Sequence, residues 1–432
     1  MEFSVESSIN LPINLVEKEI DGYWIIIAPE YPNWIVLNKT EYKMFKYLKL
    51  NSILETLQLF YDETHLSEEE CIKIMQQLLT KIELSSFYKD SIIYDEEPID
   101  QIQKQIHINL TTNCNMRCSH CFLSAGLIPK QELNVSKIID TIRKFEKIIG
   151  ITDIVISGGE PLIHPNIFEL LEGISNHNII LFTNGSLINE KNIELIAKYC
   201  NEVQISFEGV TKECYENIRG HSFNKVMESI ELLKSKNMKI ILAITILPNS
   251  MKDISDNLIN FIEELNYENL EIRLNDEIEM SGNALDMDFS NYNKVEAKKI
   301  VIDLLNILIS KGLASKVEKV RNVRFTNCGI GTNIVINFDG KIYPCNKFSD
   351  IYFESLEPNE LVNKFNELNE STSNKYMNKC INCELRYICA GGCRIDNYIK
   401  NGNMLTPICD HEYKLEQYRR LLTDYLEDYE YE

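Results

Sequence analysis

The chain has 432 residues, 13 of which are cysteines, and a formal net charge of −21. This length exceeds what one compact core needs and predicts two or three domains. The acidic charge disfavours phosphate-rich partners, so we expect no nucleic acid, and the absence of a long apolar run predicts no membrane partner. The start of the chain has no apolar secretory core, and the many cysteines favour the reducing cytosol, so we expect a cytoplasmic protein.

Residues 1–89 predict a small α+β module. Two β-branched and aromatic runs, Tyr23–Ile27 and Trp34–Leu37, are separated by turn residues, which indicates a hairpin. Three helical patterns follow, over 40–50, 52–61 and 67–84, and Ser67 with Glu70 forms a capping-box signature. A hairpin followed by three helices resembles a winged helix. Such folds often bind DNA, but the acidic charge and the lack of a basic recognition helix count against that use here.

The charged, proline-containing segment 90–103 predicts a linker. Strands and amphipathic helices then alternate through residues 104–315. The expected strands lie near 106–110, 152–156, 179–183, 202–206, 238–246 and 270–274. This alternation predicts a parallel α/β sheet that is closed or partly closed as a barrel, with functional residues at the C-terminal ends of its strands.

Three cysteines, Cys114, Cys118 and Cys121, follow the first of these strands. Three thiolates can ligate three irons of a 4Fe–4S cube, whereas a structural cluster of this kind normally takes four cysteines. The missing ligand would leave one iron free to bind something else. The alternative is a structural zinc site with His120 as its fourth ligand.

The triplet closely resembles the cysteine motif of the radical S-adenosylmethionine (SAM) enzymes, and the six strand–helix units match the partial (β/α)6 barrel of that family. The resemblance implies that the free iron chelates SAM. One electron then cleaves SAM to methionine and a 5′-deoxyadenosyl radical, which removes hydrogen from an unactivated C–H bond.

Further strand ends resemble motifs of the same family. Gly158, Gly159 and Glu160 lie in a segment similar to its GGEP motif, and Thr183-Asn184-Gly185 looks like its TNG turn. The resemblance implies cofactor contacts by Gly158, Gly159, Glu160, Thr183, Asn184, Ser206 and Arg219. Glu208 replaces the usual aspartate, and the fifth strand lacks the glycines of the adenine-contacting motif, so we expect only backbone contact there. Thr183 and Arg219 could instead be ordinary turn and surface residues.

Seven cysteines lie between 328 and 409, in the segment 316–432. Their spacing resembles the SPASM pattern, which implies two auxiliary 4Fe–4S clusters. One would be held by Cys380, Cys383, Cys389 and Cys409, and the other by Cys328, Cys345 and Cys393. The second has no fourth cysteine, so an open iron could bind a substrate thiolate or accept an electron. A pair of zinc sites is the alternative. Cys71, Cys200 and Cys214 fit no pattern and are predicted to be buried, inert thiols.

The order of winged-helix-like module, barrel and SPASM segment resembles maturases of ribosomally made peptides. Their N-terminal recognition element binds a leader as an added strand, here predicted beside Trp34–Leu37 and the helix Ser67–Leu84. The cysteine pattern resembles that of thioether synthases of the sactipeptide type, and the resemblance implies an electron donor such as flavodoxin or ferredoxin.

Other interpretations remain open: a maturase that forms a carbon–carbon crosslink, an enzyme similar to sulfatase activators, or a zinc-bearing winged-helix regulator. The sequence nominates no general base, since Asp276 and Glu277 are solvated loop carboxylates by default. It also leaves the peptide, the acceptor carbon and the oligomeric state undetermined.

Overall fold

The computed structural model describes residues 6, 8–89, 102–290, 292–314, 322–347, 350–354 and 357–429. The chain forms two compact units. The first comprises Met1–Gln101, Glu318–Ile330 and Glu367–Glu432, and the second comprises Ile102–Val317 and Gly331–Asn366. Most of the predicted linker, residues 90–101, lies outside the described residues.

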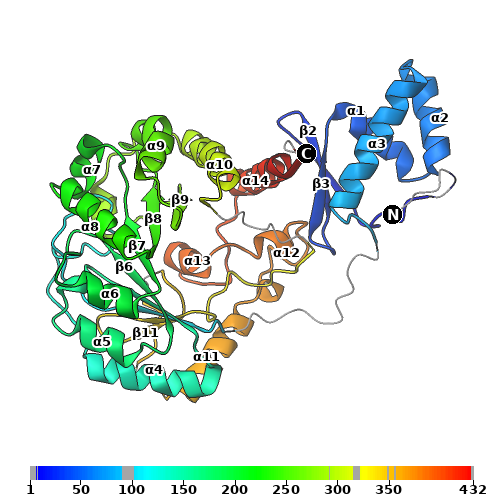
Figure 1. Ribbon diagram of the computed structural model, residues 1–432. Coiled ribbons are helices and arrows are strands. Elements are labelled where there is room, and N and C mark those ends of the chain that lie inside the picture. Colours follow the sequence, from blue (N-terminus) through cyan, green and yellow to red (C-terminus); the bar gives the residue numbers. More distant parts are fainter. Residues whose placement is uncertain are drawn as a thin grey trace. The chain divides into compact units, whose positions relative to one another are not determined.

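The second unit is built on an eight-stranded sheet in the order β11-β10-β4-β5-β6-β7-β8-β9 (Figure 1). Strands β4 to β9 are parallel and follow one another in chain order, β10 runs parallel to β4, and β11 is antiparallel at the edge. The bounds are β4 Gln105–Asn109, β5 Asp153–Ser157, β6 Asn178–Thr183, β7 Glu202–Ser206, β8 Lys239–Thr245, β9 Leu270–Asn275, β10 Ile334–Ile336 and β11 Ile342–Tyr343. The predicted α/β fold class is confirmed.

Helices cover one face of this sheet because alternate strand residues are apolar and fully buried there, as Ile108, Ile156, Leu181, Ile205 and Leu242 illustrate. The helices are α4 Val135–Ile149, η1 Pro161–Ile163, α5 Ile167–Gly173, α6 Ile193–Tyr199, α7 Lys212–Arg219, α8 Phe223–Ser235, α9 Met251–Leu265, η2 Gly282–Asp286 and α10 Lys294–Ser310. Helix α11, Pro358–Ser371, begins in the second unit and ends in the first.

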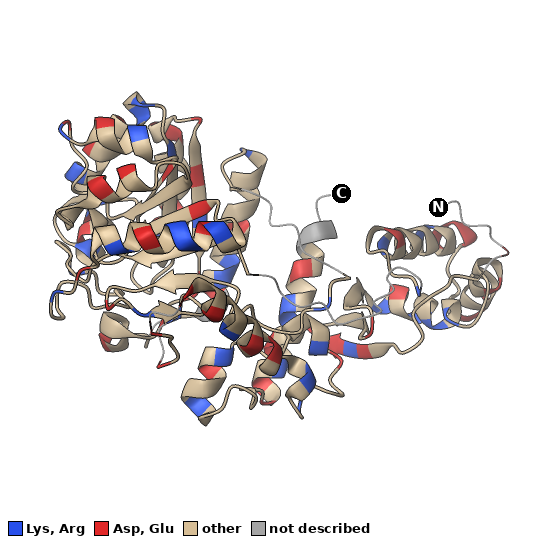
Figure 2. Cartoon of the chain, turned by 90° about the horizontal axis from the view of Figure 1, so that it is seen from below, with Lys and Arg blue, Asp and Glu red and all other residues tan. Residues whose placement is uncertain are grey.

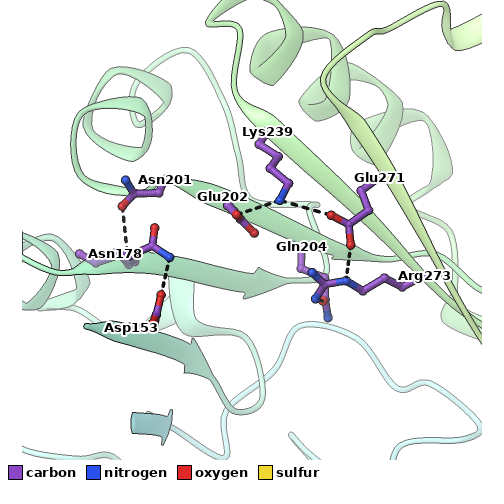
Figure 3. Close-up of polar contacts among 9 residues, drawn as sticks. Asp153, Asn178, Asn201, Glu202, Gln204, Lys239, Glu271 and Arg273 are labelled. Atoms are coloured by element: carbon purple, nitrogen blue, oxygen red, sulfur yellow. Dashed lines mark hydrogen bonds and ion pairs between the residues drawn. The ribbon is translucent and has the colours of Figure 1, made fainter. Parts of the chain in front are cut away.

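Polar side chains connect the N-terminal ends of the strands (Figure 3). Lys239 Nζ donates to Glu202 at 2.9 Å and lies 3.3 Å from Glu271, which joins β7, β8 and β9. Asn178 Nδ2 donates to Asp153 at 2.7 Å and joins β6 to β5. These contacts stabilise the end of the sheet opposite the edge at which the cysteine triplet, Gly158–Gly159, Thr183 and Ser206 lie.

The first unit contains a three-stranded antiparallel sheet of β1 Val16–Ile20, β2 Tyr23–Ala28 and β3 Asn33–Leu37. Helices α1 Lys39–Leu48, α2 Ile53–Thr64 and α3 Glu68–Leu84 follow, and each begins with a capping box. The expected hairpin and three helices are therefore confirmed, including the Ser67–Glu70 box. Strand β1 was not anticipated, because its sequence Val-Glu-Lys-Glu-Ile is mostly charged.

The C-terminal part of the first unit contributes η3 Asn374–Tyr376, α12 Arg386–Cys389, α13 Arg394–Asn401 and α14 His411–Tyr429. Helix α14 packs against the N-terminal sheet, where Tyr418, Leu421, Leu422 and Tyr425 join its core. The indole Nε1 of Trp34 donates to the Leu421 carbonyl at 3.1 Å. The two ends of the chain therefore share one hydrophobic core.

Basic residues are interspersed with acidic ones along the helices (Figure 2). In the part of the chain that the structure describes, no helix has both the length and the apolar character needed to span a membrane.

Candidate functional site

The three cysteines of the triplet lie in the loop that follows β4, and all three are half-buried. Each sulfur has an N–H donor nearby. The backbone N–H of Met116 donates to Cys114 Sγ and that of Ala125 to Cys121 Sγ, both at 3.4 Å. Arg219 Nη1 lies 3.6 Å from Cys118 Sγ. N–H donors near the sulfurs stabilise thiolates, and in iron–sulfur proteins such hydrogen bonds tune the reduction potential of the cluster. The donors around these three cysteines therefore fit an iron–sulfur cluster.

Burial raises the pKa of the Cys118 thiol to about 11, although the Arg219 charge opposes the shift. Metal ligation requires the thiolate, so binding a cluster here would release a proton. Across the described residues, no three His, Cys, Asp or Glu side chains converge closely enough to hold a single metal ion.

Two glycines after β5 hold its loop against the cysteine loop. A Cβ on Gly159 would lie 2.3 Å from the Asn113 carbonyl oxygen, and Gly158 has φ +129° with its Cβ position 2.7 Å from the Thr111 oxygen. The backbone N–H groups of Gly159 and Glu160 donate to Thr111 and Asn113 at 2.7 and 2.8 Å. Only glycine permits this approach, so these residues position the backbone from which the cysteine loop begins.

Glu160 is fully buried and joins the ends of β5 and β6. Its carboxylate accepts from the Thr183 hydroxyl at 2.8 Å and from the backbone N–H of Asn184 at 2.8 Å. Burial raises the pKa of Glu160, while these hydrogen bonds oppose the rise. Asn184 Nδ2 in turn donates to Asn115 Oδ1 at 2.9 Å and lies 3.9 Å from Cys114 Sγ. The predicted motif residues therefore form one hydrogen-bonded network beside the triplet.

Glu208 and Arg219 form a buried ion pair below the cysteine loop. His120 Nε2 lies 3.4 Å from the other Glu208 oxygen. Burial acts to raise the pKa of Glu208, but the Arg219 charge and then His120 hold it well below its ordinary value. His120 Nδ1 is buried without a partner among the described residues, which fits a site that receives a polar ligand. Arg219 is therefore not a surface residue, and Glu208 has a structural partner that sequence reasoning missed.

Ser206 is the last residue of β7, half-buried beside Ala243 of β8.

A further contact that the sequence did not reveal comes from the segment after β9. Asn283 donates from its backbone N–H to the Cys121 carbonyl at 2.9 Å, and from Nδ2 to the Cys118 carbonyl at 3.0 Å. Gly282 allows this approach, because a Cβ there would lie 2.5 Å from the Cys121 oxygen. None of the sequence motifs described above includes Gly282 or Asn283, so their contact with the cysteine loop is identified from the structure alone.

A cavity of about 350 Å³ opens beside the cysteine loop. Its lining includes the cationic residues Arg117, Arg219 and Lys225, and also His221. His221 lies 3.1 Å from Glu216, and Arg219 is buried, so the exposed positive charge of the cavity comes from Arg117 and Lys225.

In the first unit, the four cysteines predicted to hold one auxiliary cluster line a single cavity. They are Cys380, Cys383, Cys389 and Cys409. Cys328 is a near neighbour of Cys393, and hydrogen bonding with Cys393 lowers the pKa of Cys328 to about 6. Cys345 lies in the second unit, so its predicted role with Cys328 and Cys393 stays a prediction.

Of the three cysteines outside any pattern, Cys71 and Cys200 are buried as expected. Cys214 is only half-buried, so that part of the prediction was wrong. Burial and the neighbouring Asp253 raise the pKa of Cys214 to about 12, which keeps the thiol protonated.

Residues 108–261 match the Radical SAM superfamily, and this segment contains the triplet, the Glu160 network and the Glu208–Arg219 pair. The chain therefore carries a radical SAM domain. It is homologous to the antilisterial bacteriocin subtilosin biosynthesis protein AlbA of Bacillus subtilis, with 27% identity over 328 residues that cover 69% of each chain.

Two solved structures share the fold. SuiB of Streptococcus suis, bound to S-adenosylmethionine, superposes with a TM-score of 0.58 at 17% identity and covers 92% of this chain and 98% of its own. Native anSMEcpe with bound AdoMet gives a TM-score of 0.57 at 19% identity and covers 74% of this chain and 96% of its own.

Proposed function

We propose that this protein is a radical SAM peptide maturase that joins a cysteine sulfur to a carbon of another residue in a ribosomally synthesised precursor peptide. The observation that carries the proposal is the presence, in one chain, of the triplet site, the winged-helix-like module and the cavity lined by four cysteines. Homology to a protein of bacteriocin biosynthesis supports a peptide substrate. So do two solved relatives of the fold, SuiB bound to precursor peptide SuiA and anSMEcpe bound to a peptide.

The N-terminal module provides a surface for a leader peptide. Strand β3 lies at the edge of the three-stranded sheet, so an extended peptide could pair with it. Helix α3 lies against that strand, and its Lys81 Nζ donates to the Val36 carbonyl at 3.2 Å. Binding the leader here would raise the effective concentration of the segment to be modified.

In the second unit, the cysteine loop would hold the SAM-binding cluster through Cys114, Cys118 and Cys121. Bound SAM and the cluster would supply the one-electron chemistry that removes a hydrogen atom from the acceptor carbon. The chain's own residues position that chemistry: Glu160 fixes the ends of β5 and β6, and Arg219 places a positive charge beside Cys118. Closing one thioether removes two hydrogens from the peptide. The carbon loses a hydrogen atom to the 5′-deoxyadenosyl radical, and the thiol loses a proton while one electron passes to an auxiliary cluster, which would act as the oxidant.

We also expect an acidic electron donor such as a flavodoxin or ferredoxin. Arg117 and Lys225 border the cavity next to the cysteine loop, and they give local positive charge on a chain that carries −21 overall. Complementary charge there would favour encounter and would weaken with added salt.

The test is an anaerobic reaction of the reconstituted enzyme with SAM, reductant and a cysteine-containing precursor peptide encoded beside the gene. Mass spectrometry should show a loss of two hydrogens per crosslink, and the linked cysteine should no longer be alkylated. A peptide that loses two hydrogens while every cysteine stays alkylatable would instead establish a carbon–carbon crosslink. Formation of 5′-deoxyadenosine without any change in the peptide would refute the assigned substrate.

A further inference from the structure

Arg394 is the largest fully buried side chain in the described part of the chain, with 0% exposure. It is the first residue of α13 and directly follows Cys393. Its guanidinium donates only to backbone carbonyls. Nε donates to Thr372 at 2.6 Å, Nη1 to Gly392 at 2.6 Å, and Nη2 to Ala390 at 2.8 Å and Thr326 at 3.3 Å.

None of these hydrogen bonds within the described residues goes to a carboxylate. A buried charge without a counter-ion is costly, by several kcal/mol even after relaxation, and arginine cannot lose its proton at accessible pH. Carbonyl dipoles satisfy the N–H groups but leave the net charge uncompensated. The fold therefore keeps a full positive charge inside the first unit, and something nearby must carry negative charge.

The groups that can carry it are thiols. Arg394 interacts electrostatically with Cys328, Cys380, Cys389 and Cys393. By the proposed assignment, Cys380 and Cys389 belong to one auxiliary cluster and Cys328 and Cys393 to the other. Cysteine ligands bind iron as thiolates, so loading either cluster brings negative charge close to this one guanidinium.

The chain is shaped to place Arg394 there. Ala390, Gly391 and Gly392 have consecutive positive φ angles of 53°, 84° and 74°, between Cys389 and Cys393. Such a run is costly for residues with a side chain. The turn it makes directs the carbonyls of Ala390 and Gly392 onto the guanidinium. The same short turn therefore connects a ligand of each predicted cluster and binds the shared cation.

We propose that Arg394 is a positioning residue that supplies the counter-charge for the auxiliary clusters and raises their reduction potentials. The inference rests on the proposed function, which assigns clusters to these cysteines. Reduction adds one negative charge to a cluster, so a fixed nearby positive charge favours the reduced state. Removing the charge should make reduction harder.

The test uses the full chain with Cys114, Cys118 and Cys121 changed to alanine, so that only auxiliary clusters remain. Iron and sulfide are counted first, and midpoint potentials are then measured by redox titration with electron paramagnetic resonance. In R394Q, we expect the equilibrium constant for reduction of at least one cluster to fall roughly tenfold or more. This corresponds to a midpoint potential that is lower by about 59 mV for one electron. R394K keeps the charge and should stay near the parent value. R419Q removes a half-exposed arginine of the same unit, 3.3 Å from Asp21, and is the matched control.

Equal potentials in R394Q and the parent, or an equal drop in R394K, would overturn the inference. If R394Q fails to retain iron, then iron retained by R394K supports the need for the charge, whereas iron lost from both shows a purely structural role. A parent protein that binds no auxiliary cluster would instead refute the cluster assignment in the proposed function.

Discussion

The Thr183 hydroxyl lies 2.8 and 3.0 Å from the two oxygens of the Glu160 carboxylate, so its single O–H donates a hydrogen bond shared between them. This contact joins the loops after β5 and β6, which contain the GGEP-like and TNG-like segments. Glu160 therefore does more than lie beside the cysteine triplet. It is the buried acceptor that fixes the backbone on which the site is built.

Replacing Glu160 by glutamine should separate these loops. The carboxylate accepts hydrogen bonds from Thr183 and Asn184, whereas the amide nitrogen of glutamine can only donate. Loss of a buried hydrogen bond to a charged group costs about 1.5–3 kcal/mol. We expect 5′-deoxyadenosine formation to fall roughly tenfold or more, because a loss of 1.4 kcal/mol in the transition state is tenfold in rate.

The matched control is Glu169→Gln, since this exposed carboxylate on α5 bonds only to Asn166, at 2.9 Å. Thr183→Ser keeps the hydroxyl and should retain most of the activity. If E160Q and E169Q gave equal rates, the bridging role assigned to Glu160 would be wrong.

The sequence predicted the barrel well because its strands are dictated locally. The short β-branched run Ile154-Val155-Ile156, which is buried throughout, indicates a strand between two helical segments, and the Ser67 capping box indicates the start of a helix. The positions of the triplet and of the segments after β5, β6 and β7 followed from the same reasoning, because parallel strands end at one edge of a sheet.

Other features could not be predicted because they depend on partners distant in the sequence. Nothing near Asn283 indicates that it contacts the carbonyl groups of the cysteine loop. Glu208 seemed only a departure from a motif until its pairing with Arg219 was visible. The helical spacing of Tyr418, Leu421, Leu422 and Tyr425 is compatible with helix α14, but the sequence alone does not show that these residues complete the core of the N-terminal module.

The buried Glu208–Arg219 pair makes a strong prediction about stability. In the metal-free chain, Glu208→Gln leaves the Arg219 charge buried without its partner, so we expect a loss of about 3–5 kcal/mol in the free energy of unfolding. The double variant E208Q/R219M removes both charges and should lose less. Urea unfolding of the three proteins measures these differences.

The exposed pair of Lys252 and Asp256 on α9 gives the comparison, since K252M/D256N should cost under about 1 kcal/mol. E208D keeps the negative charge beside Arg219 and should be milder than E208Q. A double variant that is less stable than E208Q alone would contradict the account of an uncompensated charge.

His107 on β4 predicts how stability depends on pH. Burial lowers its pKa to about 4 from 6.5, despite a hydrogen bond with Asn109 that acts to raise it. The unfolded chain therefore binds a proton at a higher pH than the folded chain does. The stability from neutral His107 is present above pH 6.5 and is lost as pH falls toward 4.

For this shift we expect the metal-free chain to lose about 2 kcal/mol between pH 7.5 and pH 5 from this residue alone. His107→Phe preserves an aromatic ring against Phe182, which lies edge-on at 5.9 Å between ring centroids. Urea unfolding at both pH values should show a smaller acid loss in H107F. An identical loss in both proteins would exclude His107 as the source.

The packing of α14 on the N-terminal sheet predicts that the stability of the N-terminal module depends on the C-terminal helix. Ending the chain after Asp410 keeps every cysteine but removes Tyr418, Leu421, Leu422 and Tyr425 from the core of the module. Burial of each such side chain contributes about 1.5–3 kcal/mol, so their combined loss is comparable to the whole stability of a small domain. Hydrogen exchange should then become fast in β2 and β3, while β6 and β7 of the second unit serve as the internal reference.

Trp34→Phe is the graded version of this change. It removes the Nε1–H bond to the Leu421 carbonyl together with part of the buried indole, and it should cost far less than the truncation, with the exchange pattern of the module otherwise preserved. Because the leader is proposed to pair with β3, the truncated chain should also bind the precursor peptide more weakly than W34F does, as measured by fluorescence anisotropy of a labelled leader. Full protection of β2 and β3 in the truncated chain would show that the sheet folds without α14, and the module would then be independent of the segment that contains the four-cysteine cavity.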